Sequence, residues 1–591
     1  MIARRIIICL LFVLFFVIFE LNKNTVWGWV LLLAATAGLF AVFETGLPKG
    51  VLPRIACWAV YFGLVAGIFF LTYPPVRRVP AALSGGLSET GVIELRDGKV
   101  SGVLDGEAGV ELYAGIPYAA PPVGELRWKE PQDVQPWEGV LKADTFAPMS
   151  MQPRKVPIYY SLERMIGFHD YKWFDLSQKY RPEVSEDSLY VNVWKPAGEV
   201  SGLPVLVFVH GGSLQTGQPF YKDYSGEGLA SKGVVVVNMG YRLGVFGFLA
   251  LPELAAESPN GTTGNYGLLD QIKALEWVRD NISAFGGDPD NVTLAGESAG
   301  AAAVSALCTS PLAKGLFKRV ILESSTLAPE YPPHSYRTYE EALESGERFK
   351  QKYGAATLEE LRALPAEKIV SAADTEHHIT VDGYALTKSP AGSYAAGEFN
   401  ETAALHGFNA KESGPFIILS GAKLKNYEQK IRSYFGEYTE EVLALYPAKT
   451  DREAAEYWAE IYGAVFFDYP HHVYNRLAVK NGIDTYEYCF AKDNGAIGSW
   501  HSGEMIYAYG NIPADSGVYN ESDRELMRVF SSYFLNFVKN GDPNGEGLPR
   551  FDRNRDSLSY LELGEKVVPV KEKDRKAGLF EILDKIQNKR E

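Results

Sequence analysis

Cysteine is scarce in this sequence. Four cysteines occur among 591 residues, and two of them, Cys9 and Cys57, lie in long apolar runs. The remaining pair, Cys308 and Cys489, is far apart in sequence, which is more typical of two separate buried thiols than of a disulfide framework. Neither a C-x-x-C spacing nor a dense cluster of histidine and cysteine occurs, so the sequence predicts no metal site.

Positive charge is in deficit as well. The chain has 58 Lys and Arg against 73 Asp and Glu, a formal net charge of −15. An acidic chain is a poor partner for nucleic acid and for an anionic membrane surface. The composition therefore excludes nucleic acid as an expected partner, and it carries no information on the oligomeric state.

Long apolar runs are confined to the first 80 residues, at positions 6–19, 26–43 and 55–73. The second and third approach the roughly 20 residues that a helix needs to cross a bilayer. The first is shorter and follows Arg4 and Arg5, as the core of a signal peptide would, but no small-residue cleavage site comes after it. We interpret all three runs as transmembrane helices, with a cleaved signal peptide as the alternative for the first.

The flanking charges give a weak orientation signal. With the N-terminus in the cytoplasm, the positive residues on that side are Arg4, Arg5, Lys49 and Arg54, against Lys23, Arg77 and Arg78 outside. This small excess follows the positive-inside rule. Three spans then predict a multi-pass membrane region at 1–80, a linker at 81–90, and an extracytoplasmic globular domain at 91–591. If only the second and third runs span, that domain lies on the same side as the N-terminus.

The globular part shows an α/β pattern. Continuous apolar runs at 204–209, 234–237, 292–295 and 319–322 are typical of strands covered on both faces, as in a mainly parallel sheet. Residues 268–285 carry apolar side chains at helical spacing, and 93–95 with 99–103 suggest a hairpin. The prediction is a large, mostly parallel central sheet flanked by helices.

A serine flanked by glycines follows one of these strands. Residues 296–300 read G-E-S-A-G, which matches the G-x-S-x-G turn that places a nucleophilic serine between a strand and a helix. The turn is too tight for side chains on either side of the serine, which is why the chemistry requires glycine there. Ser298 is therefore the candidate nucleophile.

A serine hydroxyl needs a neighbouring base, and the base needs an acid to orient it. Of the nine histidines, His210 opens a glycine-rich loop after a buried strand, and we interpret it as a packed loop residue whose value lies in the backbone amides around it. His501, in a polar glycine-rich loop after 485–490, is the better base. If the chain order is serine, acid, histidine, Glu412 is a candidate acid, although its spacing alone does not distinguish it from a surface carboxylate.

Further motifs make the interpretation of the serine turn more specific. In chain order they are 113–122 (Y-A-G-I-P-Y-A-A-P-P), 126–128 (L-R-W), 185–193 (S-E-D-S-L-Y-V-N-V), 210–212 (H-G-G), 264–271 (G-N-Y-G-L-L-D-Q), 285–289 (F-G-G-D-P), the serine turn, 310–312 (S-P-L), 315–317 (G-L-F), 498–504 (G-S-W-H-S-G-E) and 541–544 (G-D-P-N). Together they resemble the type-B carboxylesterase and cholinesterase family of α/β-hydrolases, over about residues 90 to 565.

The resemblance implies an α/β-hydrolase fold and a set of site residues. It makes Ser298 the nucleophile, Glu412 the acid and His501 the base. It aligns the oxyanion-hole donors with Gly212, Ser213 and Ala299, and it gives Ser324 and Glu504 a role in supporting the histidine. The activity that it implies is hydrolysis of small carboxylic esters through an acyl-enzyme, without a cofactor.

Three features depart from the family pattern. Ser213 stands where the family usually has a third glycine. Ser150 and Ser188 occupy two positions where many secreted relatives have a disulfide. Their presence fits a bacterial relative, or any lineage that does not rely on that bridge, and leaves the loop between Met151 and Glu186 tied down by packing alone. The third departure is the membrane region. The loop at 151–186 contains aromatic residues that either line a gorge or cover the core. They are Tyr159, Tyr160, Phe168, Trp173 and Phe174.

Two rival functions remain open. Some members of the family are adhesion proteins that have lost the serine, so a catalytically idle binding protein is one alternative; the filled triad positions favour an enzyme. A lipase, thioesterase or amidase would use the same three residues, because pocket shape selects the substrate.

Overall fold

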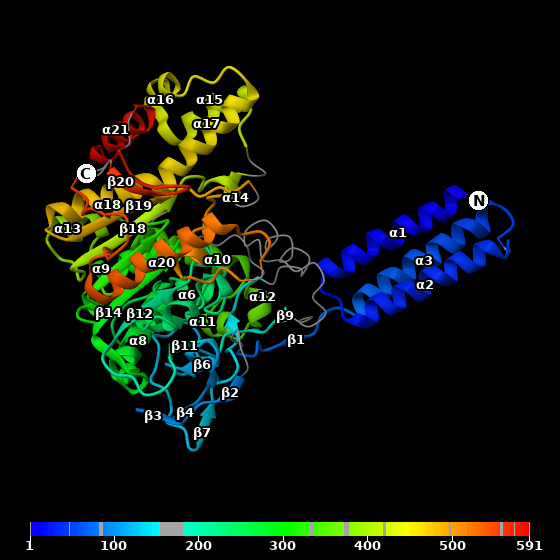
Figure 1. Ribbon diagram of the computed structural model, residues 1–591, viewed down its shortest axis with the longest axis horizontal. Helices are drawn as coiled ribbons and strands as arrows, with labels where there is room; N and C mark the ends of the chain where they lie inside the picture. The colour runs from blue at the N-terminus through cyan, green and yellow to red at the C-terminus, as the bar shows by residue number, and fades with distance from the viewer. Residues whose placement is uncertain are drawn as a thin grey trace. The chain divides into compact units, whose positions relative to one another are not determined.

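The computed structural model describes residues 2–46, 48–81, 87–153, 181–330, 336–370, 378–417, 421–495, 498–514, 516–555, 559–571 and 574–589. The chain divides into two compact units (Figure 1). The first comprises Met1–Val79 with Arg154–Glu183, and the second Pro80–Pro153 with Val184–Glu591. The boundaries predicted at 80 and 90 stay predictions.

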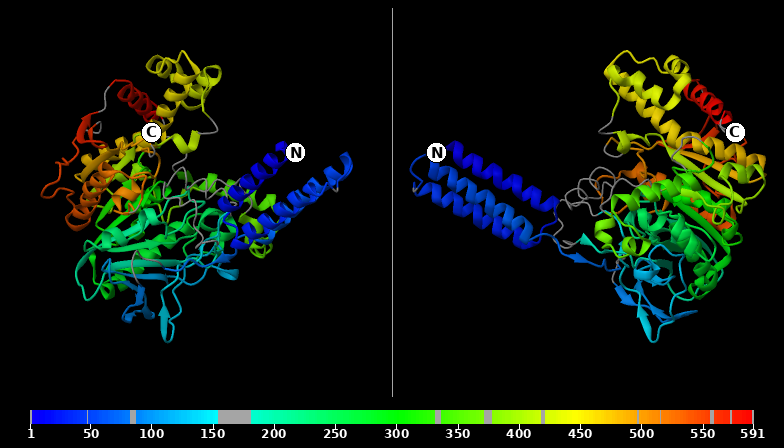
Figure 2. Two further views of the ribbon diagram at one scale, coloured as in Figure 1. Left: turned by 45° about the vertical axis from the view of Figure 1, so that its right-hand side comes forward. Right: turned by 180° about the vertical axis from the view of Figure 1, so that it is seen from behind.

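Three apolar helices form most of the first unit. They are α1 (Ile2–Leu21), α2 (Val26–Glu44) and α3 (Val51–Leu71), and each is long and apolar enough to cross a membrane. They run side by side (Figure 2). Polar contacts join them: Thr36 Oγ1 lies 3.0 Å from the Tyr61 hydroxyl, and Asn24 donates to Thr72. The two-residue strand β1 (Val76–Arg77) follows α3 and pairs with β9 (Arg181–Pro182) in the same unit.

A large mixed sheet organises the second unit. The order of its described strands is β2 (Leu87–Glu89), β5 (Val103–Asp105), β6 (Val110–Pro117), β11 (Tyr190–Pro196), β13 (Val235–Met239), β12 (Leu203–Val209), β14 (Gly287–Glu297), β15 (Arg319–Glu323), β18 (Ala403–Asn409), β19 (Asp484–Phe490), β20 (Ser559–Leu563) and β21 (Val567–Lys571). From β13 to β20 every neighbouring pair is parallel, and antiparallel strands complete both edges. Figure 1 shows β14, β18 and β19 in this sheet.

The central strands are buried, and most of their residues are apolar on both faces. Every residue of β13 and β15 is buried, as expected for strands covered on both sides. Helices α8 (Tyr266–Asn281), α9 (Ala299–Thr309) and α20 (Glu521–Asn540) contact strand β14. The α/β-hydrolase fold, the strands predicted from apolar runs and the helix predicted from residue 268 are all confirmed.

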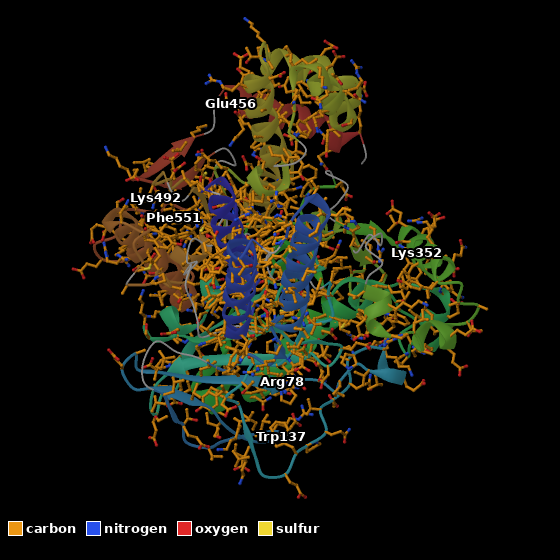
Figure 3. The ribbon with its side chains drawn as sticks, turned by 90° about the vertical axis from the view of Figure 1, so that its right-hand side faces the viewer. Arg78, Trp137, Lys352, Glu456, Lys492 and Phe551 are labelled. Atoms are coloured by element: carbon orange, nitrogen blue, oxygen red, sulfur yellow. The ribbon has the colours of Figure 1, made fainter. Side chains whose placement is uncertain are left out.

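A second, smaller sheet of three described strands packs against the same core as the large one. The predicted hairpin forms as β3 (Ile93–Leu95) with β4 (Gly98–Ser101), and β7 (Val140–Lys142) pairs with β4. Trp137, labelled in Figure 3, donates a hydrogen bond from its indole to the Lys99 carbonyl oxygen at 3.0 Å.

The serines at the disulfide positions show one difference from expectation. Ser150 lies in β8 (Met149–Ser150), which pairs in parallel with β10 (Val184–Ser185), and its hydroxyl donates to the Tyr241 carbonyl oxygen at 2.6 Å. The ends of the loop are therefore joined by backbone hydrogen bonds, and the expectation that packing alone holds them was wrong. The five loop aromatics from Tyr159 to Phe174 lie outside the described residues.

Candidate active site

Ser298 lies at the sharp turn between strand β14 and helix α9. Its backbone is left-handed, with φ 56° and ψ −126°, a conformation that costs a non-glycine residue free energy. Its amide donates to the Glu323 carbonyl oxygen at 2.8 Å, which ties the turn to strand β15. A Cβ atom on Gly300 would lie 2.1 Å from the Val209 carbonyl oxygen, so this position accepts only glycine. The predicted turn is thus present, and Ser298 is partly exposed.

The glycine-rich loop after β12 packs against this turn. A Cβ on Gly211 would lie 3.0 Å from the Cβ of Ser298. Ser213 adopts φ 57°, so the serine keeps the left-handed backbone that glycine would favour. In the described part of the chain, no protein acceptor takes a hydrogen bond from the backbone amides of Gly212, Ser213 or Ala299. These amides are free to donate to a ligand.

His210, which opens this loop, is a packed residue, as predicted. It is 1% exposed, and its ring stacks on Tyr241 with the centroids 4.6 Å apart. Burial lowers the pKa of His210 to about 4, so the ring is neutral at physiological pH.

His501 and Glu412 meet although 89 residues separate them. Glu412 follows the end of strand β18, and its Oε2 lies 2.6 Å from His501 Nδ1. The carboxylate is 1% exposed, and its other oxygen accepts the Asn409 amide at 2.7 Å. A buried carboxylate at Nδ1 fixes the tautomer in which Nε2 can accept a proton.

The second ring nitrogen of His501, Nε2, lies beside a residue that the sequence analysis did not propose for the site. His501 Nε2 lies 3.3 Å from Oε1 of Glu297, the residue that precedes the candidate nucleophile. Ser502 donates to the same Oε1 at 2.6 Å. Among the described residues no hydrogen bond joins the Ser298 hydroxyl to His501. The structure therefore brings His501 to Glu412 and to the turn, with Nε2 facing Glu297.

Ser324 and Glu504 lie behind the histidine. The Ser324 hydroxyl donates to Glu504 Oε1 at 3.2 Å, and the Asn409 side chain donates to Glu504 Oε2. Asn409 thus contacts both Glu412, through its backbone, and Glu504, through its amide group. Ser324 and Glu504 are brought to the site, but neither makes a direct hydrogen bond to His501 in the part of the chain that the structure describes.

Burial of several carboxyl groups dominates the electrostatics. It raises the pKa of Glu412 to about 8, against hydrogen bonds from Ser324 and Asn409 that lower it. Burial also raises the pKa values of Glu297 and Glu504 to about 7, and that of Glu323 well above the ordinary range. The imidazole contacts favour the ionised forms of Glu412 and Glu297. The site thus titrates as a group of interacting residues near neutral pH.

Two aromatic rings border His501. The Phe416 ring lies edge-on at 5.0 Å between centroids, and the Phe467 ring lies at 4.9 Å. Phe416 belongs to the short helix α14 (Gly414–Ile417), and Phe467 to the π-helix η6 (Ala464–Asp468). Such π-helical turns are rare in proteins, but those that occur are often found at functional sites. No signal in the sequence indicated Phe467, whereas Glu297 and Ser502 stood within motifs already noted.

The described residues contain no cluster of side chains that could bind a metal ion. No group of three or more histidine, cysteine, aspartate or glutamate residues in the described ranges is arranged to hold a metal ion. Cys308 and Cys489 are both buried and form no disulfide with each other, as their separation in sequence predicted.

Comparison with known proteins identifies the family of the chain. The model of the carboxylesterase family matches residues 89–579. Fumonisin B1 esterase from Sphingopyxis macrogoltabida is 33% identical over 490 residues, which cover 78% of this chain and 85% of that protein. Carboxylesterase 1C from Mus musculus is 31% identical over 512 residues, covering 80% and 89%. The crystal structure of a Geobacillus stearothermophilus carboxylesterase superposes with a TM-score of 0.70 at 29% identity, covering 83% of this chain and 99% of that one.

The family match spans most of the chain, and the relatives align with it over most of their own length. The motifs in the sequence, the α/β-hydrolase sheet and these matches agree, and the chain belongs to the carboxylesterase family and is a carboxylic ester hydrolase.

Proposed function

We propose that the protein hydrolyses carboxylic esters through an acyl-enzyme on Ser298, with His501 as the base and Glu412 as the acid that orients it. The observation that carries this assignment is the 2.6 Å contact between His501 Nδ1 and buried Glu412 Oε2, with Nε2 beside Glu297, the residue that precedes Ser298 in the turn. No cofactor takes part in this chemistry.

In the first half of the reaction the Ser298 oxygen attacks the ester carbonyl carbon while its proton passes to His501 Nε2. The carbonyl oxygen gains negative charge, and the free amides of Gly212, Ser213 and Ala299 donate to it. The imidazolium then protonates the leaving alkoxide, which departs as an alcohol. Because Nε2 faces Glu297 in the free enzyme, a small shift of the ring accompanies substrate binding, as is common when catalytic hydrogen bonds tighten on binding.

In the second half, His501 removes a proton from water, and the resulting hydroxide attacks the acyl carbon. Collapse of the intermediate releases the carboxylic acid and returns the proton to Ser298. When His501 takes up the proton, its positive charge beside Glu412 favours the ionised carboxylate against the effect of burial, and the carboxylate in turn stabilises the imidazolium at both stages. Ser324 and Glu504 support this arrangement from behind, through Asn409, which contacts both Glu504 and Glu412.

Replacement of the nucleophile tests the mechanism. We expect Ser298→Ala to reduce kcat for p-nitrophenyl acetate by several orders of magnitude, about 10⁴-fold or more, with an unchanged far-UV circular dichroism spectrum. Ser283→Ala, at an exposed position of the 3-10 turn Ile282–Phe285, is the matched control and should behave as wild type. Retention of wild-type turnover by Ser298→Ala would exclude Ser298 as the nucleophile.

We further propose that α1, α2 and α3 cross the membrane, with the N-terminus in the cytoplasm and the catalytic domain, residues 91–591, outside. The length and apolar surface of the helices support the spans, and the excess of Arg4, Arg5, Lys49 and Arg54 at one end supports the orientation. A reporter active only in the cytoplasm, fused to the C-terminus of the full chain, should be silent. Strong reporter activity would reverse the orientation.

The acyl and alcohol groups of the substrate are set by the shape of the pocket and not by the triad. Phe416 and Phe467 beside His501 provide an apolar border, which favours substrates with an apolar group near the scissile bond. Turnover of a series of p-nitrophenyl esters from acetate to decanoate, together with ethyl, benzyl and thioester analogues of one acid, would define both groups. A uniform rate across the acyl series would argue against this apolar border as a selector.

A further inference from the structure

Ser502, directly after the catalytic histidine, has an unusual backbone. Its φ is 68°, in the left-handed region that non-glycine residues seldom occupy. Ser213, Leu214, Ser298 and Ser324 are further described non-glycine residues with positive φ at this site, and the three serines each have a place in the proposed function. Backbone strain that is retained in a folded protein is a reason to look for a function at that residue.

The strained turn allows two neighbouring side chains to reach one atom. In an extended chain, successive side chains point to opposite sides, but here His501 Nε2 and Ser502 Oγ both face Glu297 Oε1. The hydroxyl is the closer donor, at 2.6 Å, and the imidazole nitrogen lies at 3.3 Å. A charge-assisted N–H···O contact is normally about 2.7–2.9 Å, so the imidazole is not fully engaged by this carboxylate.

We propose that Ser502 is a positioning residue, whose hydroxyl holds the Glu297 carboxylate so that it stabilises the imidazolium of His501 without capturing Nε2 from Ser298. The inference rests on the proposed function, because it requires His501 to be the base for Ser298. It assigns the strained backbone a purpose, since the left-handed turn at Ser502 aims the hydroxyl at Glu297 Oε1 beside the imidazole.

The charges around Glu297 determine what removal of the hydroxyl would do. Facing Glu297 are the imidazole of His501 and the carboxyl groups of Glu323, Glu412 and Glu504. The phenol groups that interact with it belong to Tyr224, Tyr241, Tyr488 and Tyr509. No lysine or arginine is among these groups.

The direction of the titration shift follows from these neighbours. Burial raises the pKa of Glu297 to about 7, while the imidazole and the Ser502 hydrogen bond lower it. Without the hydroxyl the ionised carboxylate loses a hydrogen-bond donor, so the pKa of Glu297 rises further. Below that pKa the neutral carboxyl group no longer stabilises the imidazolium of His501, and the site is less active. The acidic limb of the kcat/KM profile should therefore move to higher pH.

The test uses the full-length protein and p-nitrophenyl acetate between pH 5 and 9. Ser502→Ala and Ser502→Gly should each move the acidic limb upward by about one pH unit, with kcat/KM approaching wild type at pH 9. Ser502→Gly relieves the backbone strain, so its Tm should not fall below that of wild type. A merely structural role for Ser502 would change Tm and leave the pH profile in place.

Ser499→Ala is the matched control. It removes a hydroxyl that is buried in the same loop and has no hydrogen-bond partner among the described residues, and its profile should coincide with wild type. If both Ser502 variants also coincide with wild type while Ser298→Ala is inactive, the inference about Ser502 is overturned and the proposed function stands. If Ser298→Ala is active, both are overturned together.

Discussion

The two sides of the His501 imidazole are built differently. On the Nδ1 side, Glu412 is fully buried, contacts the ring at 2.6 Å and is held in turn by the Asn409 amide. On the Nε2 side, the contact with Glu297 is longer, at 3.3 Å, and it lies beside the partly exposed Ser298. A base needs one face fixed, so that its tautomer is defined, and one face free to exchange partners during the reaction. We call the Nδ1 side, held by Glu412, the rigid face, and the Nε2 side, next to Glu297, the adjustable face. This contrast makes the arrangement suitable for acyl transfer.

Removing the charge on the rigid face should have the larger effect. Glu412→Gln keeps the size of the side chain but presents either an amide or a neutral carbonyl to Nδ1, so the imidazolium loses its counter-charge and the tautomer is no longer defined. We expect kcat for p-nitrophenyl acetate to fall about 10³- to 10⁴-fold.

Glu412→Asp, which retains the charge, is the control for the charge itself and should recover part of the activity. Equal rates for Glu412→Gln and wild type, measured with both proteins folded by circular dichroism, would show that another group orients the histidine.

Removing the charge on the adjustable face should have a smaller effect. Glu297→Gln abolishes one favourable interaction with the imidazolium but leaves Glu412 in place. We expect kcat/KM at pH 7 to fall about tenfold, which corresponds to a change of roughly one unit in the balance between protonation states. A loss as large as that of Glu412→Gln would mean that both faces are equally essential and would remove the contrast between them.

The smallest expected effect concerns stability, at a carboxyl group behind the turn. Burial raises the pKa of Glu323 well above the ordinary 4.5, and its one hydrogen-bond donor in the described chain is Tyr509, at 2.9 Å. Between pH 4.5 and the folded-state pKa, the unfolded chain releases this proton and the folded protein retains it. Glu323 therefore lowers the free energy of unfolding progressively as the pH rises through this window.

Glu323→Gln is neutral at every pH and removes this penalty. We expect the variant to raise Tm by about 2 °C at pH 8 and by less than about 1 °C at pH 5, measured by differential scanning calorimetry. A gain that is larger at pH 5 than at pH 8 would have the wrong sign for a carboxyl group with a raised pKa.

How much of the site the sequence predicts depends on how local each feature is. The turn at Ser298 was predictable because five consecutive residues encode it, and the packed state of His210 followed from its place after a buried strand. The pairing of Glu412 with His501 came from resemblance to a family, because many carboxylates lie between Ser298 and His501 and spacing alone does not select one.

The adjustable face could not be predicted in the same way. The contact of Ser502 with Glu297 spans 205 residues and depends on a left-handed backbone at a residue that is not glycine. No propensity indicates such a conformation at a serine, because tertiary contacts impose it. The position of Phe467 likewise depends on a π-helical turn, which has no reliable sequence signal.

The most direct test of the account is to identify the residue that becomes covalently modified. Wild-type protein treated with a fluorophosphonate should gain the mass of one adduct, lose esterase activity in proportion, and carry the adduct on the peptide that contains Ser298. His501→Ala should react far more slowly, because the base is missing. An adduct on another residue, or full inactivation with Ser298 unmodified, would contradict the assignment of nucleophile and base.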